Sequence, residues 1–396
     1  MRRRALAGAL ILALAGPAGC SRGERFDDVF SPVDVRLPGP VTAMAALGHE
    51  ALLGTYDVSA RPRAGLFRVS STDDLVPLDI TASSPYAFEG RFRYLATDGN
   101  EVTGLTGISG GAHGNVRWAV WRGAGPVLEQ PQTFETFGGI DAGALTGVAY
   151  DATGPLLVGS WKSAVTGLDA AIWRPEGTRW VRAESAGTAL ANRADRLVQI
   201  SAAATAPGGR ALLAGAATDL QQGVRVAPLA WVERDGQWHA QELPTLLAAE
   251  SANGVSTGVE AASCGPVWCV LAGRDHGELR AWLGRFSADG TFTVDTVRAP
   301  VRGSAQAGDT MTSLVPDQAE WVGTGVSAAY AWLALADGSG AGTVWRWPLP
   351  RSTAGTDGGM LELEVPGSPT AVAVAGDRVW LAGTAKERVA LWSARG

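Results

Sequence analysis

The chain has 396 residues, of which 46% are hydrophobic and 18% are charged, and its formal net charge is −6. This length is ample for a large hydrophobic core, and the mild negative charge argues against nucleic acid or an anionic membrane patch as a partner. Bulk composition therefore points to a large folded protein without fixing its activity.

The first segment of the chain has the composition of an export signal. Arg2, Arg3 and Arg4 form a cationic start, and an apolar stretch of about 11 residues follows over 5–15, too short to span a bilayer. We therefore expect residues 1–19 to be a signal peptide that directs export and is then removed.

The end of this signal, Gly16-Pro17-Ala18-Gly19-Cys20, resembles the lipobox of bacterial lipoproteins. The resemblance implies that the Cys20 thiol is acylated and becomes the mature N-terminus, which would give stable membrane anchoring. Pro17 stands where that family usually has an aliphatic residue, so ordinary signal-peptidase cleavage is the alternative. Ser21, in place of the Asp that retains enterobacterial lipoproteins at the inner membrane, implies the outer membrane. Residues 20–31 are expected to be a lipidated cysteine with a short charged tether, and 32–396 a single folded domain.

A pair of apolar runs recurs along that domain. Clear copies occupy 41–55, 146–160, 200–215, 259–273 and 370–384, and weaker copies lie at 94–107 and 324–336. A third run with an aromatic residue near an arginine follows, as in Ile172-Trp173-Arg174, and then a turn and a fourth run. Four short strands repeated at roughly 50 to 60 residues are typical of a β-propeller. We predict an all-β fold with seven four-stranded blades.

The last repeat, which ends near Arg395, contains only three strands. The segment 32–38 precedes the first repeat and has the pattern of the missing fourth strand. Pairing of the N-terminal strand into the last blade would close the ring and leave no free sheet edge there.

The aromatic third strands account for many of the 15 tryptophans. Adjacent blades pack face to face, so one large side chain for each blade can fill each interface. We expect core positions for five of these residues: Trp121, Trp173, Trp231, Trp345 and Trp392.

Cys264 and Cys269 are separated by four residues that include Gly265-Pro266. This spacing fits a hairpin whose facing residues lie close enough for a disulfide, and export would supply the oxidising conditions. Two thiols alone cannot form a structural zinc site, so we predict a disulfide bond.

One propeller face carries the loops that join second to third strands and the loops between blades, and such loops commonly bind partners. The candidate binding residues on that face are Tyr56, Asp57, Trp161, Lys162, Arg274, Asp275 and His276. Trp161 with Lys162, and the Arg274-Asp275-His276 cluster, are the two places we favour. A solvated rim without a binding role is the alternative for any single residue.

The sequence offers no catalytic or metal-binding constellation that we can assign. The four histidines are scattered over different repeats without metal-ligand spacing. We therefore expect no metal and no cofactor.

The unit around Gly147-Val148-Ala149-Tyr150-Asp151 and Leu157-Val158-Gly159 looks like the blades of secreted bacterial propellers of the NHL or Asp-box sort. The leading hypothesis is a non-catalytic envelope lipoprotein whose propeller face binds a protein or glycan. The alternative is a carbohydrate-active hydrolase or lyase with acidic residues converging at the channel mouth. A third hypothesis, a structural part of a larger envelope assembly, predicts an exposed apolar patch on the outer edge of a blade.

Overall fold

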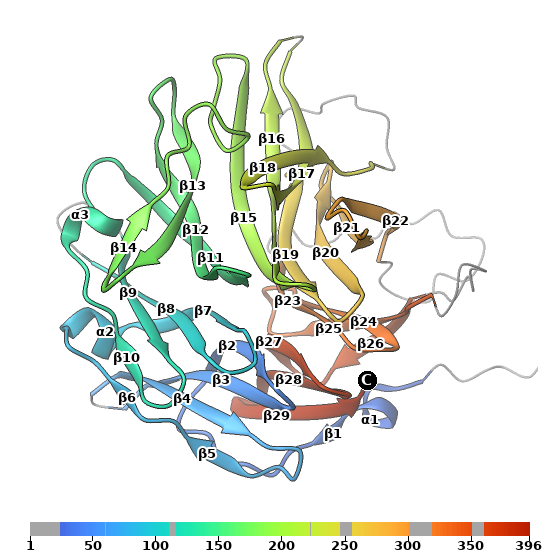
Figure 1. The fold of residues 1–396 in the computed structure, drawn as a ribbon. Helices are drawn as coiled ribbons and strands as arrows, with labels where there is room; N and C mark the ends of the chain where they lie inside the picture. The colour runs from blue at the N-terminus through green and yellow to red at the C-terminus, as the bar shows by residue number, and fades with distance from the viewer. Residues whose placement is uncertain are drawn as a thin grey trace, which may run out of the picture.

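A computed structural model describes residues 24–59, 61–110, 116–221, 223–245, 256–300, 319–350 and 360–396. The expected signal peptide and the expected lipidation site at Cys20 lie outside the described residues. Seven β-sheets are arranged around a central axis (Figure 1). The prediction of seven blades is therefore confirmed.

The strands follow one another outward in each blade, and their bounds can be given blade by blade. Blade 1 contains β2 (Val41–Leu47), β3 (Glu50–Asp57), β4 (Arg63–Val69) and β5 (Leu75–Pro77). Blade 2 contains β7 (Arg91–Thr97), β8 (Val102–Ser109), β9 (Val116–Gly123) and β10 (Val127–Glu129), with β6 (Ile80–Thr81) added in parallel beside β10. Blade 3 contains β11 (Ala142–Asp151), β12 (Gly154–Lys162), β13 (Leu168–Glu176) and β14 (Arg179–Arg182). Blade 4 contains β15 (Arg196–Ala206), β16 (Arg210–Asp219), β17 (Arg225–Arg234) and β18 (Gln237–Glu242).

The remaining three blades follow the same plan. Blade 5 contains β19 (Gly258–Cys264), β20 (Trp268–Asp275), β21 (Glu278–Phe286) and β22 (Phe292–Arg298). Blade 6 contains β23 (Glu320–Val326), β24 (Tyr330–Ala336), β25 (Gly342–Pro348) and β26 (Leu361–Val365). Blade 7 contains β27 (Ser368–Ala375), β28 (Arg378–Ala385), β29 (Arg388–Arg395) and β1 (Ser31–Pro32).

The ring closes through the N-terminal segment, as predicted. Ser31 pairs with Ser393 and Pro32 with Trp392, both in β29, and the Val33 backbone N–H donates to the Leu391 carbonyl at 2.9 Å. The paired strand is shorter than the predicted segment 32–38. Val33 is buried with the core between blades 7 and 1, and the chain then crosses to blade 1 without extending the ladder.

Part of the segment expected to be a tether is folded against the ring. Helix α1 (Phe26–Val29) and Phe30 place two buried rings on blades 6 and 7. Phe26 meets Trp392 edge-on at 5.6 Å, and Phe30 meets Trp332 edge-on at 5.5 Å, both between ring centroids. Only the residues before this helix remain available as a linker to Cys20.

Every innermost strand contains a bulge at an equivalent position near its start. The shared register shift leaves one extra residue in each strand: Thr42, Arg93, Thr146, Ser201, Glu260, Val322 and Thr370. Strand β11 has a second shift, between Ala142 and Leu145. A bulge bends its strand and re-aims side chains. In blades 4 and 5 the facing residue is Gly215 or Gly273, where a side chain would collide with the carbonyl of Gln199 or Gly258. The repeated glycine in the second strand is therefore coupled to the bulge.

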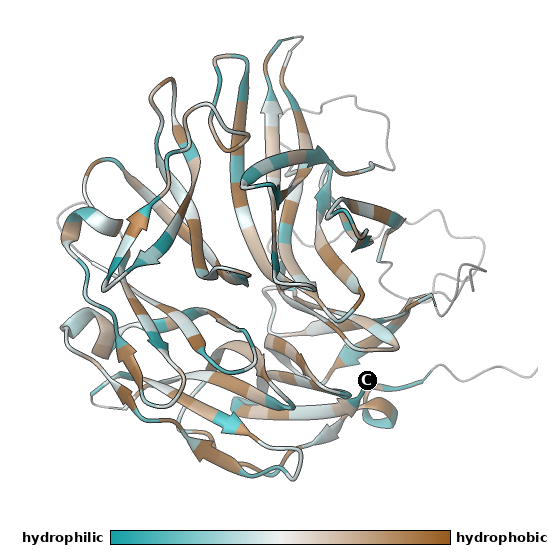
Figure 2. Cartoon of the chain, in the orientation of Figure 1, coloured by the Kyte–Doolittle hydropathy of each residue, from teal (hydrophilic) through white to brown (hydrophobic). Residues whose placement is uncertain are grey.

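The large aromatic side chains fill the interfaces between blades. All five tryptophans predicted to be core residues are buried. The indole N–H of Trp173 donates to the Thr136 carbonyl at 3.0 Å, and that of Trp231 donates to the Ala189 carbonyl at 3.0 Å. These hydrogen bonds fasten the loops that enter blades 3 and 4. Figure 2 shows hydrophobic residues recurring along the strands around the ring.

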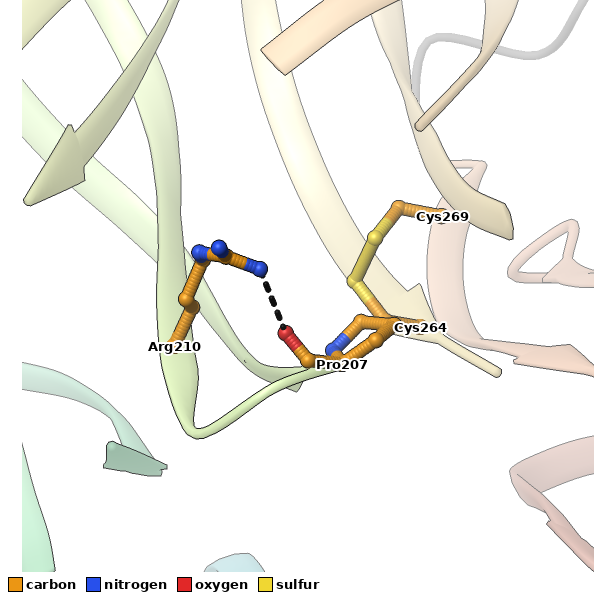
Figure 3. The surroundings of a disulfide bond; sticks show 4 residues. All are labelled: Pro207, Arg210, Cys264 and Cys269. Carbon is orange, nitrogen blue, oxygen red and sulfur yellow. Dashed lines mark hydrogen bonds between the residues drawn. A yellow bond between two sulfur atoms is a disulfide. The ribbon is translucent and has the colours of Figure 1, made fainter. Parts of the chain in front are cut away.

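Cys264 and Cys269 form the predicted disulfide across the turn that joins β19 to β20 (Figure 3). Their backbones are also paired as facing residues of the hairpin. Pro207 and Arg210, in the equivalent turn of blade 4, lie beside the bond in this view, and Arg210 donates to the Pro207 carbonyl at 3.3 Å.

Candidate functional site

The two faces of the ring differ in the loops that they carry. Because strands alternate in direction, the loops from second to third strands and the loops between blades share one face, here named the crossover face. The turns within the first and second hairpins of each blade form the opposite hairpin face, which carries the disulfide. Every predicted binding residue lies on the crossover face, at the end of β3, β12 or β20 or directly after it. The structure does not bring them together, since they belong to blades 1, 3 and 5.

Tyr56 and Asp57 have partners in their own neighbourhood. The guanidinium of Arg91 stacks over the Tyr56 ring at 4.4 Å from its centroid. Asp57 lies 3.7 Å from Arg63 in an ion pair. Tyr56 thus serves as a platform for an arginine at the start of β7.

The Arg274-Asp275-His276 cluster points inward rather than lining an open rim. Asp275 is fully buried, lies 2.7 Å from Nδ1 of His276 and is 3.7 Å from Arg280. Arg274 pairs with Glu260 at 3.3 Å and donates to the Ala319 carbonyl. His276 has φ of 52°, a left-handed backbone that histidine tolerates in turns. This cluster holds the start of blade 5 together, and a binding role for it stays a prediction.

The channel mouth is lined by equivalent residues of all seven innermost strands. They enclose a cavity of about 360 Å³ whose described lining contains one carboxylate, that of Glu260. Burial raises the pKa of Glu260, and the nearby Arg274 partly offsets this effect. Burial likewise raises the pKa of Tyr94, which blade 2 contributes to the cavity lining. The hydrolase or lyase alternative predicts acidic residues that converge at this mouth. Among the described residues, Glu260 lines the cavity, and the negative charge of Glu320 is near enough to raise the pKa of Glu260 further.

Two further cavities flank the segment 131–133 on the outer part of blades 2 and 3. The first has a volume of about 490 Å³ and lies between helix α2 (Pro85–Glu89) and helix α3 (Phe134–Phe137). The second has a volume of about 600 Å³ and runs along β14. Large aromatic side chains line the two cavities: Tyr86, Trp118, Phe134 and Phe137 in the first, and Trp161, Trp173 and Trp180 in the second. We name the pair the blade 2–3 grooves.

The walls of these grooves are fastened by side-chain hydrogen bonds. The Glu129 carboxylate accepts from the backbone N–H and hydroxyl groups of Ser83 and Ser84, at 2.5–2.7 Å. Ser84 also caps helix α2 by accepting from the Ala87 N–H at 3.1 Å. The Gln132 side chain donates to the Trp118 carbonyl at 2.5 Å, and its own Oε1 has no hydrogen-bond partner. The grooves are preformed, and among the described residues Gln132 Oε1 and Arg117 Nε of the first groove are left for water or a ligand.

Sequence reasoning identified Trp161 and Lys162 but missed most of the groove. Trp161 packs edge-on against Trp173 at 6.1 Å between ring centroids, and Lys162 pairs with Asp141 at 3.0 Å. Tyr86 and Phe134 are 50% and 56% exposed although both are large aromatic residues. The available signal was an aromatic residue in each of two inter-blade loops, outside the repeated strand pattern.

Among the described residues, no group of three or more His, Cys, Asp or Glu side chains is placed to hold a metal ion. None of the helices in the described ranges is long and apolar enough to cross a membrane.

Comparison with known proteins adds information about the fold. No protein-family model matches the chain, and no curated protein matches it. One similar solved structure is the β-propeller domain of Cps50 (Swd1) from Myceliophteria thermophila, with 10% identity, a TM-score of 0.50, and coverage of 92% of this chain and 99% of that one. Another is the β-propeller domain of the Trilobed protease from Pyrococcus furiosus, with 9% identity, a TM-score of 0.47, and coverage of 91% and 96%. The chain has the propeller fold.

Proposed function

We propose that the protein is an exported, lipid-anchored envelope protein that binds a partner protein, without catalysis, through the blade 2–3 grooves. The observation that carries the proposal is the pair of preformed cavities on either side of residues 131–133, both floored by aromatic rings. Concave, largely apolar sites with a few fixed polar groups are the usual form of a binding site.

Several large hydrophobic side chains around the grooves are exposed to solvent. Besides Tyr86 and Phe134, the exposed hydrophobic residues include Ile140, two residues after the groove wall at Gly138, and Val181 on β14. Clustered exposed apolar side chains mark interaction sites, and tryptophan, tyrosine and arginine dominate the binding energy of protein interfaces. Exposed aliphatic residues favour a protein over a glycan, because sugars bind chiefly on aromatic platforms and polar groups.

The lipid anchor would orient these grooves away from the membrane. Helix α1 docks on blades 6 and 7, and four residues lie between Cys20 and Arg25, so five Cα-to-Cα steps give a reach of at most about 18 Å. In a ring of seven blades, blade 3 lies opposite the junction of blades 6 and 7. The anchored edge would therefore face the lipid, and blade 3 would face the envelope space. The outer membrane is the location that Ser21 favours.

The first test is site-specific photo-crosslinking in cells, with a photoreactive residue in place of Phe134. The matched control carries the same residue in place of Val267, which is 57% exposed on the hairpin face. We expect one abundant crosslinked protein from position 134 and none from position 267. Absence of any crosslinked protein at position 134, or an equal yield at both positions, would rule out the grooves as the binding site.

The anchor needs a separate measurement. Mass spectrometry of the mature N-terminal peptide should find an acylated Cys20 as the first residue. An unmodified N-terminus at any other residue would contradict lipidation and leave the groove proposal untouched.

A further inference from the structure

Four arginines on the crossover face of blades 1–3 lie over aromatic rings. Arg91 stacks on Tyr56 at 4.4 Å, Arg93 on Trp118 at 5.8 Å, Arg117 on Phe134 at 4.6 Å, and Arg182 on Trp161 at 5.2 Å, each measured from the guanidinium carbon to the ring centroid. We name these four residues the arginine row. Phe134 and Trp118 line the first groove, Trp161 lines the second, and Arg93 lines the channel mouth.

None of these four arginines forms an ion pair with an acidic side chain in the described part of the chain. Three neighbouring carboxylates are engaged elsewhere: Asp57 pairs with Arg63, Asp141 pairs with Lys162, and Glu129 accepts four hydrogen bonds from Ser83 and Ser84. A fourth, Glu135, lines the second groove, and hydrogen bonds from its own backbone N–H and from Thr133 lower its pKa. Four arginines of blades 2 and 3 therefore lack an acidic partner among the described residues, on a chain whose net charge is −6.

An arginine that lies over a ring can still offer N–H groups to a ligand, although Arg182 uses one of its own to donate to the Ala183 carbonyl at 3.3 Å. Those groups match the two oxygens of a carboxylate, and such charge-assisted pairs are stronger than neutral hydrogen bonds. The ring beneath limits the rotamers of the side chain, so less entropy is lost on binding. The row is thus a preorganised anion-binding surface beside two apolar grooves.

We propose that the partner segment recognised by the blade 2–3 grooves is acidic and apolar, with Asp or Glu residues on the arginine row and large apolar side chains in the two cavities. This inference rests on the proposed function and adds the chemistry of the partner. An acidic glycan would neutralise the arginines but would leave the exposed Val181 and Ile140 without apolar partners.

The test in cells repeats the Phe134 crosslinking in a chain that also carries Arg117→Glu and Arg182→Glu. We expect at least a tenfold loss of crosslinked partner, because two attractive charge contacts become repulsive. The control chain carries Arg285→Glu and Arg346→Glu on the hairpin face and should keep the wild-type yield. An undiminished yield in the first variant would overturn the acidic-segment inference while leaving the proposed function standing. No crosslinked protein in the wild type would instead refute the proposed function.

A second measurement fixes the chemical class. Fluorescence anisotropy with the detergent-extracted mature protein would compare a labelled 12-residue peptide of alternating Glu and Leu with its Gln–Leu counterpart and with an oligogalacturonate. We expect the Glu–Leu peptide to bind at least tenfold more tightly than the Gln–Leu peptide, with an affinity that falls as salt rises. Equal binding of both peptides, or binding of the oligogalacturonate alone, would overturn the inference.

Discussion

Arginines lie over aromatic rings on both faces of the propeller, but the two sets differ in whether a carboxylate pairs with the guanidinium. On the hairpin face, Arg285 over Trp268 pairs with Asp295 at 3.1 Å, and Arg378 over Trp380 pairs with Asp73 at 2.7 Å. Arg346 over Tyr330 likewise pairs with Glu24, at 2.5 Å. On the crossover face of blades 1–3, the four arginines of the row have aromatic partners but no described acidic partner.

The same side-chain pair can therefore serve two purposes. A stacked arginine with a carboxylate partner has both its flat face and its edge occupied, so it has little left to offer a ligand. A stacked arginine without such a partner is held in position and remains open at its edge. Arg210 over Phe286, on the hairpin face, has no carboxylate partner among the described residues and donates to the Pro207 carbonyl, much as Arg182 of the row donates to the Ala183 carbonyl. The comparison separates a stabilising set of contacts from a binding set.

The largest expected difference is in the free energy of unfolding lost when an aromatic ring beneath an arginine is removed. Trp380 is fully buried, whereas Phe134 is 56% exposed. Trp380→Ala should lower the free energy of unfolding by about 3–5 kcal/mol, because it leaves a cavity in the core, and Phe134→Ala should lower it by less than about 1 kcal/mol. Urea denaturation of both variants measures this. Equal losses of stability would mean that Phe134, like Trp380, stabilises the fold. The aromatic residues of the two faces would then not divide into a stabilising set and a binding set.

Removal of the disulfide should affect only the stabilising face. The double change Cys264→Ala with Cys269→Ala should lower the free energy of unfolding by about 2 kcal/mol, as expected for so short a loop. Partner capture at position 134 should not change. Reducing agent should lower the wild-type denaturation midpoint to that of the double variant and leave the double variant unaffected. Loss of partner capture in a folded double variant would show that the two faces are coupled.

The paired and unpaired arginines provide a smaller contrast. Arg378 also donates to the Ser71 carbonyl and, at 2.7 Å, to the Ser393 hydroxyl. Arg378→Leu should lower the free energy of unfolding by about 1 kcal/mol, because it removes these bonds and a partly exposed ion pair. Arg117→Leu should change it by less than about 0.5 kcal/mol. Denaturation midpoints at low and high salt would check both values, and a larger loss for Arg117 would contradict a binding role for the row.

The architecture was predictable because the same pattern of apolar and aromatic residues recurs in each of the seven blades. Apolar runs at equivalent positions predicted the strands, and one aromatic residue in each third strand predicted the buried Trp121 and Trp173. The disulfide followed from local spacing alone. The repeated bulges were not predicted, although Val41-Thr42-Ala43, Leu145-Thr146-Gly147 and Ile200-Ser201-Ala202 share the pattern. A bulge becomes visible only when the register of the neighbouring strand is known.

The grooves were less predictable because they lie outside the repeat. Tyr86 and Phe134 occur once each, in loops of different length, so no comparison between blades could identify them. The Arg274 cluster has the composition of a binding site, but its orientation toward Glu260 depends on the bulge in β19. Phe26 and Phe30 were assigned to a tether because charged residues surround them, whereas the folded ring supplies Trp392 and Trp332 as partners. The composition of a segment predicts its burial only where the residues that it packs against are also known.

The smallest expected effect is a pH dependence of stability, whose sign differs between Glu260 at the channel mouth and Asp289 on the hairpin face. Burial raises the pKa of Glu260 at the channel mouth, whereas hydrogen bonds from Ser287 and Thr291 lower the pKa of Asp289 on the hairpin face. Between the ordinary carboxyl pKa of about 4.3 and the raised value, native Glu260 binds more protons than the unfolded chain, so its contribution to stability falls as pH rises. The contribution of Asp289 is present above its ordinary pKa and is lost as pH falls through the lowered value.

Glu260→Gln should therefore make the free energy of unfolding rise relative to wild type as pH increases through this window, and then level off. Asp289→Asn should produce the opposite trend at lower pH. The shape of each difference curve is diagnostic, because loss of the Arg274 ion pair adds a further change of its own to the first variant. Urea titrations at several pH values measure both curves. A Glu260→Gln curve that falls with pH would mean that attraction to Arg274 outweighs burial, and that the channel mouth presents an ionised carboxylate to any ligand.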